Sequence, residues 1–557
     1  MSGNYTIGTY LLDRLKEMGV SHVFGVPGDY AFPLFAAQEA DPEMTWIGEC
    51  NELNGAYAAD GYARINGVGA YMVTCGVGEL SASCGLAGAF SEGVPVIAIV
   101  GHPPTVAPNG RQQTHHSLRN DFDGFARIAA EMTCAHAVLT RENATAEIDR
   151  LLQECWAQRL PVYLAVPEDL GDLPAERPSA KLHLSTPQSD PNQLDIFLSD
   201  LLPRLRAAHR PVILADSAVG RYALTPLVQE FAAKAKIPTA VVFSGMSASF
   251  DETRPEFLGT YLGVPGDDIT ERVSGTDLLL RLGIRSGETN QGAADPDWHD
   301  PKVVDLGIDA ARIGETDYPG VALEGVLTAL LGQAGQLGDF ELVPAASIAA
   351  PAFTAQPDAA ITQDRLYERL ASFLNEGDVF VVDQGTCNSA IGIPKPAGVS
   401  TITEFTWGAI GFAPPALVGA LVAAPDRRHV MITGDGSLQM TAQSLSTVLR
   451  HNFAPIIIVL NNGRYVIENV VGFAKPQDNT YNYLHSWDYQ GLLSVFDPTG
   501  DAIGIKVGTE KEFDDALTDA ARRHDQGVCT LIEVVLSPDD VPTALTRTFG
   551  ALLGAGS

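Results

Sequence analysis

The chain has 557 residues, of which 45% are hydrophobic and 19% are charged, so it is long enough for several globular domains and is neither disordered nor collagen-like. It contains 36 lysine and arginine residues and 68 aspartate and glutamate residues, which gives a formal net charge of −32. Because such a chain repels phosphate backbones and anionic lipid headgroups, we expect neither a nucleic-acid partner nor a membrane partner.

The cysteines and the hydropathy pattern indicate a cytoplasmic location. The seven cysteines form no CxxC pair and have no zinc-ligand spacing, which is typical of a reducing compartment. Residues 1–19 have the pattern of an amphipathic helix rather than of a cleavable signal. No apolar stretch reaches the ~18 residues that a membrane span needs.

Short apolar runs alternate with helical stretches along the chain, which predicts an α/β fold. Residues 10–18 have helical spacing of apolar side chains, and 22–26 form a short strand pattern. The runs at 71–74 and 96–100 are rich in β-formers and are followed by glycine. Because helical stretches separate these runs, we expect parallel strands joined by crossover helices.

Two proline-containing stretches, 174–190 and 344–357, have the composition of linkers. They divide the chain into three predicted domains, at 1–185, 190–343 and 358–557, and each has the size of a typical single domain. The predicted fold class is therefore α/β, with three doubly wound parallel-sheet domains.

The most informative motif lies in the third domain. A strand at 429–433 leads into Gly434-Asp435-Gly436-Ser437, and the next strand, at 455–460, ends in Asn461-Asn462. The glycines let backbone N–H groups approach a phosphate at the start of a helix. Asp435 would repel a bare phosphate, so a divalent cation between the two is expected, with Asn462 as a second oxygen ligand. Mg²⁺ takes such oxygen ligands together with a diphosphate.

A GDG tripeptide on its own is also common in ordinary β-turns. The asparagine pair, one βαβ unit later, favours the metal site over the plain turn. The motif resembles the signature of enzymes that bind thiamin diphosphate (ThDP). Nearly the whole chain is similar to the pyruvate, indolepyruvate and branched-chain 2-keto acid decarboxylases. The matching blocks are FGVPGD at 24–29, NELN at 51–54, AADGYAR at 58–64, GVGELS at 76–81, the histidine pair at 115–116, DQGT at 383–386, WGAIG at 407–411 and YVIE at 465–468.

The resemblance implies a pyrimidine-binding first domain, a middle domain, and a third domain that binds the diphosphate and Mg²⁺. It implies non-oxidative decarboxylation of a 2-keto acid to an aldehyde and CO₂, through a ThDP ylide and an enamine. It further implies that each site combines the first domain of one subunit with the third domain of another. We therefore expect a homodimer at minimum, and a homotetramer as the assembly.

The resemblance also assigns the catalytic residues. Glu52 would activate the cofactor, while Asp29, His115, His116 and Glu468 would transfer protons near the reacting carbon. For Glu52 the alternative is a glutamate placed in the first turn of a helix by the helix dipole. For the histidines it is an ordinary surface or capping role.

The cofactor-binding residues follow from the same blocks. Ile410 would bend the cofactor as a wedge, or else would only pack in the core, and the Gly408 carbonyl would hold the cofactor's amino group. The metal ligands would be Asp435, Asn462 and the backbone carbonyl of Arg464. The remaining contacts to the cofactor would come from Thr74, Thr386, Gly434, Gly436, Ser437, Tyr465 and Ile467.

The chain departs from the family at two places. Arg464 stands where relatives carry an acidic or polar residue, which leaves the backbone ligand intact but adds a cation near the diphosphate. The substrate pocket would contain Gln384, Asn388 and Ile467, completed by a C-terminal helix at 548–552. Because Asn388 replaces a bulky apolar residue, we expect a substrate larger or more polar than pyruvate.

Three alternatives to this function are a carboligase, a non-catalytic assembly protein and a dinucleotide-binding protein. Carboligation, in which the same intermediate attacks a second carbonyl compound, has the same residue requirements. A non-catalytic assembly protein with this fold is disfavoured by the intact set of candidate catalytic residues. The stretch 76–81 resembles a dinucleotide-binding turn but lacks its last glycine and a supporting acidic residue. The middle domain has no cysteine, so we expect hyperbolic kinetics without cysteine-dependent activation.

Overall fold

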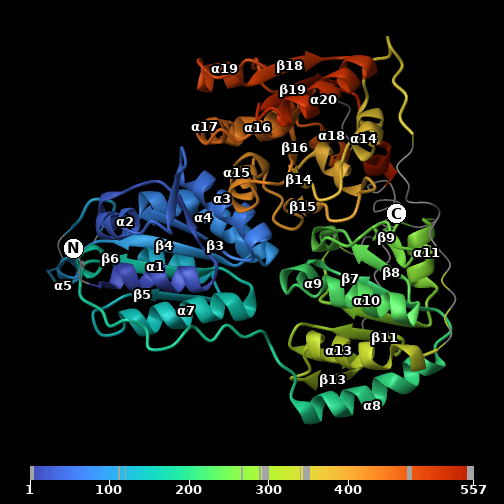
Figure 1. Cartoon of the computed structure of the whole chain (residues 1–557), viewed down its shortest axis with the longest axis horizontal. Helices are drawn as coiled ribbons and strands as arrows, with labels where there is room; N and C mark the ends of the chain where they lie inside the picture. Colours follow the sequence, from blue (N-terminus) through green and yellow to red (C-terminus); the bar gives the residue numbers. More distant parts are fainter. Residues whose placement is uncertain are drawn as a thin grey trace.

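The structure is a computed structural model of the chain, and it describes residues 5–110, 113–119, 121–264, 267–287, 290, 300–338, 340, 342, 352–472 and 479–547. Three units, each built on a sheet with flanking helices, follow one another in sequence (Figure 1). The predicted α/β class with three sheets is confirmed. The boundaries drawn between the domains stay a prediction, and part of the second linker, 344–351, lies outside the described residues.

The first domain contains a parallel sheet of order β2-β1-β3-β4-β6-β5. Alternate residues of β4 are buried on opposite faces, with Ile97 and Ile99 on one side and Ala98 and Val100 on the other, as a sheet covered on both faces requires. Its strands are β1 (His22–Gly25), β2 (Thr45–Gly48), β3 (Gly69–Thr74), β4 (Val96–His102), β5 (Ala135–Val138) and β6 (Val162–Pro167). Its helices are α1 (Ile7–Glu17), η1 (Asp29–Ala31), α2 (Phe32–Glu39), α3 (Glu52–Asn66), α4 (Val77–Glu92), α5 (Val106–Gly110), α6 (Gly124–Ala130), α7 (Ala144–Gln158) and η2 (Glu168–Leu170).

The middle domain contains a sheet of order β13-β12-β11-β10-β7-β8-β9. At one edge of this sheet, β12 pairs antiparallel with both β11 and β13. This edge was not predicted. The connection from β12 to β13 is only Gly314 and Glu315, and so short a turn forces an antiparallel pair. The strands are β7 (Pro211–Ala215), β8 (Thr239–Val242), β9 (Phe257–Tyr261), β10 (Leu278–Leu282), β11 (Val303–Leu306), β12 (Ala310–Ile313) and β13 (Thr316–Pro319). The helices are α8 (Pro191–Ala207), α9 (Ser217–Arg221), α10 (Thr225–Ala235), η3 (Ser244–Ala248), α11 (Asp268–Ser274), α13 (Leu323–Gln333) and η4 (Ala334–Gln336).

The third domain repeats the architecture of the first, with a parallel sheet of order β15-β14-β16-β17-β19-β18. The strands are β14 (Val379–Val382), β15 (Ser400–Ile402), β16 (His429–Gly434), β17 (Ile456–Asn461), β18 (Ile503–Val507) and β19 (Thr530–Val535). The helices are α14 (Gln363–Ala371), η5 (Thr386–Gly392), α15 (Ala413–Ala423), α16 (Asp435–Thr441), α17 (Ser444–Arg450), α18 (Val466–Val471), η7 (Thr480–Asn482), α19 (Leu492–Phe496) and α20 (Glu510–His524).

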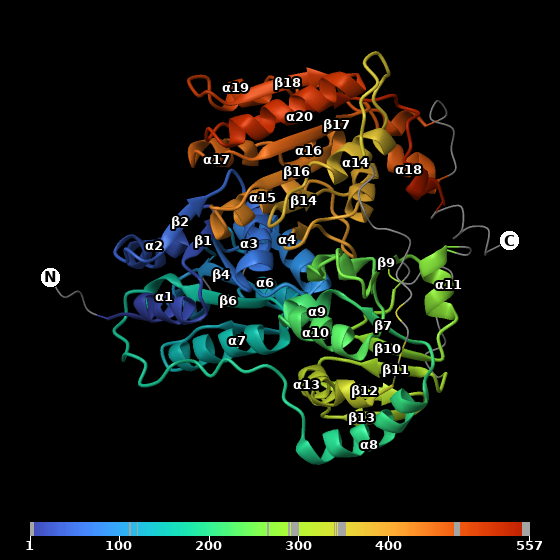
Figure 2. The ribbon, with the colours of Figure 1, turned by 45° about the vertical axis from the view of Figure 1, so that its right-hand side comes forward.

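The first and third domains meet where α3 crosses α15 (Figures 1 and 2). Glycines permit this close approach. A Cβ atom on Gly419 would lie 1.9 Å from the carbonyl oxygen of Ala58, and one on Gly61 would lie 2.2 Å from that of Ala416. Neither position tolerates a side chain unless the helices separate, so the sequence of these helices sets how the two domains pack.

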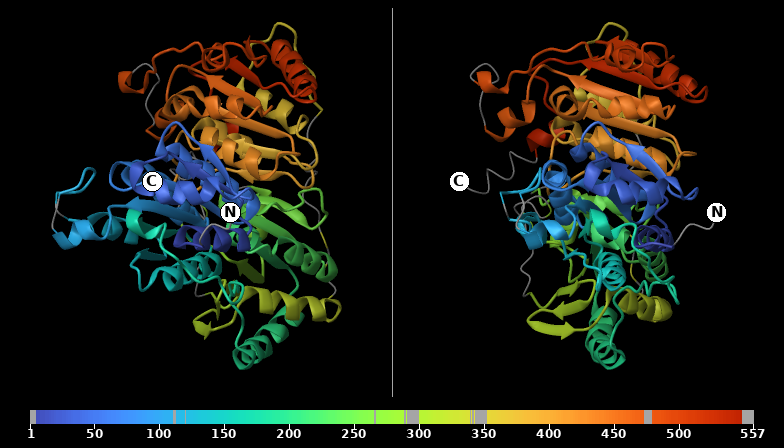
Figure 3. Two further views of the ribbon diagram at one scale, coloured as in Figure 1. Left: turned by 60° about the vertical axis from the view of Figure 1, so that its left-hand side comes forward. Right: turned by 90° about the vertical axis from the view of Figure 1, so that its left-hand side faces the viewer.

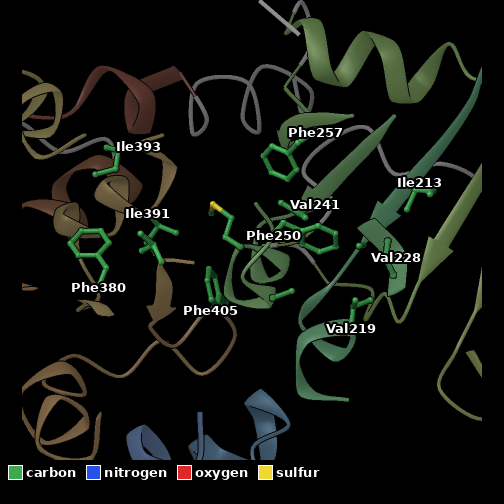
Figure 4. Packing of buried hydrophobic residues seen from close by; sticks show 14 of the residues in the cluster. Ile213, Val219, Val228, Val241, Phe250, Phe257, Phe380, Ile391, Ile393 and Phe405 are labelled. Atoms are coloured by element: carbon green, nitrogen blue, oxygen red, sulfur yellow. The ribbon is translucent and has the colours of Figure 1, made fainter. Parts of the chain in front are cut away.

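The middle domain is joined to the third by a shared apolar core (Figure 4). Phe405 of the third domain packs edge-on against Phe243, with ring centroids 5.2 Å apart. At the same junction, the buried Lys395 Nζ lies 2.8 Å from Glu252 Oε1. The views in Figure 3 show the first domain lying alongside both of the others. Within the part of the chain that is described, no helix has the length and apolar character needed to cross a membrane.

Candidate functional site

Asp435 occupies the turn between β16 and α16, at the carboxyl end of a central strand. Its carboxylate is held from two sides: Gly436 N–H donates to Oδ1 at 2.8 Å, and Gly463 N–H donates to Oδ2 at 2.7 Å. Only 2% of the residue is exposed, and this burial raises the pKa of the Asp435 carboxyl to about 6, against the opposing effect of the backbone donors. A bound cation would favour the charged form.

Asn462 follows β17, the strand next to β16, so both side chains sit at the same edge of the parallel sheet. The Asn462 side-chain oxygen accepts the backbone N–H of Arg464 at 3.1 Å, which fixes the turn. The guanidinium of Arg464 lies over the ring of Tyr483, 4.2 Å from its centroid, and donates to the Tyr483 hydroxyl at 2.9 Å. The side chain of Arg464 is therefore directed to this tyrosine.

These residues fit a hard divalent cation with a diphosphate. The side chains at the strand ends offer carboxylate and amide oxygens, the donor types that Mg²⁺ prefers. Gly436 lies against the Tyr465 ring, where a Cβ atom would come within 2.4 Å of a ring carbon. Only glycine fits between that ring and the start of α16, where the N–H groups of Gly436 and Ser437 belong to the first turn of the helix.

The loop that contains Gly408 and Ile410 is anchored by buried acidic side chains. Glu92, at the end of α4, accepts three consecutive backbone N–H groups through Oε1, at 2.9, 2.6 and 2.9 Å, from Phe405, Thr406 and Trp407. Ile410 is only partly buried, and Trp407 is 41% exposed. This exposure argues against simple core packing for the loop and leaves Ile410 accessible, as a wedge requires.

The far end of the same loop is held by Asp383, the residue that follows β14. Its Oδ1 accepts the N–H of Gly411 at 3.0 Å, and its Oδ2 accepts the hydroxyl of Thr433 at 2.8 Å. Complete burial raises the pKa of Asp383 to about 6. The loop is thus tied to the strand that leads into Asp435.

The candidate substrate-pocket residues lie next to this loop. The Gln384 side-chain amide donates to Thr403 Oγ1 at 3.2 Å and to the backbone oxygen of Glu404, while its oxygen accepts from Asn388 Nδ2 at 3.3 Å. Ser437 Oγ donates to the Gln384 backbone oxygen at 3.1 Å, which connects Gln384 to the GDGS turn. The predicted helix at 548–552 lies outside the described residues.

Two further candidates flank this group. Thr386 is buried, and its backbone oxygen accepts the Tyr367 hydroxyl at 2.9 Å. Ile467 and Glu468 lie on α18, where Glu468 is exposed. The structure therefore brings the third-domain candidates to one edge of one sheet.

Glu52 is the first residue of α3 in the first domain. The helix begins there because Asn51 caps it, accepting the Asn54 N–H at 2.9 Å. Glu52 Oε1 points toward Gly78 at the start of α4, since a Cβ atom on that glycine would lie 3.6 Å away. The hydroxyl of Thr74, at the end of β3, is buried without a hydrogen-bond partner in the described structure. Such an unpaired buried hydroxyl fits a contact to a bound cofactor.

Asp29, His115 and His116 form a compact cluster in the same domain. His115 Nε2 lies 2.8 Å from Asp29 Oδ2, and one polar atom of each of the three side chains lies within 4.8 Å of the others. Tyr30 orients His115 by stacking on its ring at 4.6 Å and by a 3.0 Å contact between its hydroxyl and Nδ1. The cluster is suited to holding and passing protons.

The candidates thus form two groups, one in the first domain and one in the third. Within the described residues, no hydrogen bond or ion pair joins Glu52, Asp29 or the histidine pair to Asp435 or Asn462. The start of α3 instead contacts α17 of its own chain, through the bond from Asn54 Nδ2 to Ser444 Oγ at 2.7 Å. Large apolar side chains are exposed beside both groups: Val77, Leu80, Trp407 and Met440.

Sequence reasoning missed the supports of the loop, Glu92 and Glu404. Both are buried and act on backbone groups of the same loop, but Glu92 lies more than three hundred residues away in the chain. Glu92 is the last residue of α4, and a glutamate in a helix is common. Glu404 precedes the WGAIG block, and nothing in the sequence around it indicates burial. Their burial could not be read from any local pattern.

Comparisons with known proteins agree with this geometry. Three family models match the chain: the N-terminal TPP binding domain of thiamine pyrophosphate enzymes at residues 5–126, their central domain at 198–333, and their C-terminal TPP binding domain at 384–534. An alpha-keto-acid decarboxylase of Mycobacterium tuberculosis H37Rv is 36% identical over 556 residues, which cover 98% of this chain and 97% of that protein. An alpha-keto-acid decarboxylase of Mycolicibacterium paratuberculosis is 37% identical over 556 residues, covering 98% of this chain and 96% of that protein.

Proposed function

Because the chain belongs to the family of ThDP-dependent 2-keto acid decarboxylases, we propose that it converts a 2-keto acid to the corresponding aldehyde and CO₂, with Mg²⁺ as the metal. The observation that carries this proposal is the Asp435 carboxylate, fixed by backbone donors beside Asn462 at the ends of adjacent parallel strands. When bound there, the cofactor supplies the acceptor for the electrons that the departing CO₂ leaves behind.

In this proposal the protein's own residues bind, orient and exchange protons. The cation is held by Asp435, Asn462 and the Arg464 carbonyl. In the neighbouring loop, the backbone carbonyl of Gly408 holds the cofactor's amino group, and the side chain of Ile410 is the wedge that bends the cofactor. Glu52 exchanges a proton with the cofactor's ring. Asp29, already paired with His115, acts with the histidines and Glu468 on protons near the reacting carbon.

We further propose that each complete site contains parts of two subunits. The separation of the two candidate groups within one chain supports this arrangement, and so do the exposed apolar side chains next to them. Val77 and Met440 are both 55% exposed, which is unfavourable on a free surface but is typical of a surface that a partner covers. A homodimer is the smallest assembly in which each site combines the two groups of candidate residues, and a homotetramer would pair two such dimers.

The substrate is proposed to be larger or more polar than pyruvate, because Asn388 lines the pocket where a bulky apolar residue is expected. In an aldehyde-release assay with ThDP and Mg²⁺, we expect kcat/KM for aromatic, branched or polar 2-keto acids to exceed that for pyruvate by about tenfold or more. Replacing Asn388 by phenylalanine should shift this ratio toward pyruvate, while Ser389→Ala should leave it nearly unchanged. A wild-type preference for pyruvate would contradict the proposed substrate class.

A further inference from the structure

The buried carboxyl group of Glu404 supports the loop that contains Gly408 and Ile410, which is called the cofactor loop below. Only 1% of Glu404 is exposed. Its Oε2 accepts the backbone N–H of Ala409, the residue between Gly408 and Ile410, at 2.8 Å. Its backbone oxygen accepts the side-chain N–H of Gln384. Glu404 therefore contacts both the cofactor loop and the side-chain amide of Gln384, a candidate substrate-pocket residue.

The other oxygen of Glu404 lies in a closed, apolar position. A Cβ atom on Gly88 of α4 would come within 2.6 Å of Oε1 and within 3.0 Å of the Trp407 ring. Oε1 has no hydrogen-bond partner within the described residues. In the same part of the chain, no lysine, arginine or histidine forms a salt bridge with Glu404.

The charged groups that face Glu404 are mostly acidic. They are Asp60 of α3 and Glu92 of α4, with Arg64 of α3 as the opposing cation, and the hydroxyl of Tyr57 also lies in this junction. Arg64 is paired with Asp60 rather than with Glu404: its Nε lies 2.5 Å from Asp60 Oδ1, its Nη1 donates to the backbone oxygen of Thr403 at 2.6 Å, and its Nη2 has no hydrogen-bond partner within the described residues.

The buried Arg221 of α9 does not change this balance for Glu404. The carboxylates that act on the pKa of the Arg221 guanidinium are those of Asp60 and Glu92. A charged Glu404 would therefore be a third buried carboxylate with one oxygen unpaired, which is strongly unfavourable. Burial, followed by the charges of Asp60 and Glu92, raises the pKa of Glu404 well above its ordinary value.

We propose that Glu404 works as a neutral, protonated carboxyl group whose side chain positions the cofactor loop through Ala409, and that loss of its proton displaces the loop, because an unpaired buried charge drives the side chain toward water. Glu404 is a positioning residue, since it acts on the cofactor through Ala409 and its neighbours. This inference rests on the proposed function, because Gly408 and Ile410 are taken as cofactor-binding residues.

The test compares ThDP binding to the wild type, Glu404→Gln and Glu404→Ala by calorimetry in the presence of Mg²⁺. At a pH below the raised pKa of Glu404, the glutamine variant should bind ThDP within about threefold of the wild type, because an amide oxygen replaces the neutral acid, whereas alanine should weaken binding by about tenfold or more. Glu256→Gln, which alters a buried glutamate of the middle domain, is the matched control and should bind like the wild type.

The pH dependence distinguishes a positioning role from simple packing. Because the pKa of Glu404 is raised in the folded protein, its contribution is present at acidic pH and is lost as the pH rises through that raised value. Across a pH series that passes through this raised value, the ThDP affinity of the wild type should therefore fall by about tenfold more than that of Glu404→Gln. The infrared band of a protonated carboxyl group should also be weaker in Glu404→Gln than in the wild type.

Three results would each overturn the inference: a glutamine variant as weak as the alanine variant, wild-type affinity in Glu404→Ala, or equal pH slopes in wild type and Glu404→Gln. The slope comparison does not require the alanine variant to fold. If ThDP bound as expected but no aldehyde formed, the proposed function would fail while the role of Glu404 stood. If the wild type bound no ThDP, both would fail.

Discussion

Replacing Glu52 by glutamine is expected to lower kcat/KM for 2-keto acid decarboxylation by about a hundredfold to ten-thousandfold. Glutamine keeps the size and the hydrogen-bonding capacity of the side chain but cannot exchange a proton with the cofactor. Asn51 caps α3 with its own side chain, so the helix should still begin at the same residue. Steady-state aldehyde release measures the effect, and the ThDP dissociation constant should change by only a few-fold.

The matched control is Glu49→Gln, three residues earlier in the chain. Glu49 is also buried, accepts the Thr447 hydroxyl at 3.0 Å, and has its pKa raised to about 7 by burial. Because this carboxyl is buried away from solvent and its neutral form resembles glutamine, the Glu49→Gln variant should keep most of the activity. Full activity in Glu52→Gln, or equal losses in both variants, would rule out the proposed role of Glu52.

Replacing Asp435 by asparagine is expected to weaken the joint binding of Mg²⁺ and ThDP by about two orders of magnitude. A direct ligand should contribute at least as much as the ten- to hundredfold loss in metal affinity that accompanies removal of a supporting residue. The amide has a single acceptor oxygen, so it keeps only one of the two hydrogen bonds from Gly436 and Gly463, and it carries no charge to oppose that of the cation. Because a ligand stabilises the state to which it binds, Mg²⁺ with ThDP should raise the melting temperature of the wild type but not of this variant.

The control for Asp435 is Asp426→Asn, an exposed aspartate in the loop before β16. It changes the net charge of the domain equally and should leave binding intact. An unchanged thermal shift in Asp435→Asn would contradict the assignment of the cation site.

The two variants together test whether each site is shared between subunits. In a mixed dimer of Glu52→Gln and Asp435→Asn chains, a shared arrangement places both changes in one site and leaves the other site unaltered. Random pairing should then restore about a quarter of the wild-type activity, since about half of such dimers are mixed. If each site belonged to one chain, every site would keep one defect and no activity would return.

The sequence predicted the parts of the molecule that depend on local pattern. The strands at 71–74 and 96–100 were found, each slightly longer, as β3 and β4, because their apolar residues are buried on both faces of a parallel sheet. Asp435 and Asn462 were expected at one sheet edge because they follow adjacent strands, and the register of β16 with β17 places them there.

What the sequence did not predict depends on contacts between distant segments. Glu92 holds the backbone of Trp407, and no pattern around either residue indicates that they meet. The same is true of Glu404, whose unpaired oxygen results from the packing of α4 against the loop. The antiparallel edge of the middle sheet depends on a two-residue turn at Gly314 and Glu315, a local signal that was overlooked.

The most direct test of the central claim is the carbon balance of the purified full-length protein with ThDP, Mg²⁺ and a preferred 2-keto acid. The account predicts that CO₂ and the aldehyde one carbon shorter are released in equal amounts, and that chelation of the metal or omission of ThDP abolishes both. CO₂ release without aldehyde, with an acyloin as the product, would instead identify a carboligase. No CO₂ release from any 2-keto acid would contradict the account as a whole.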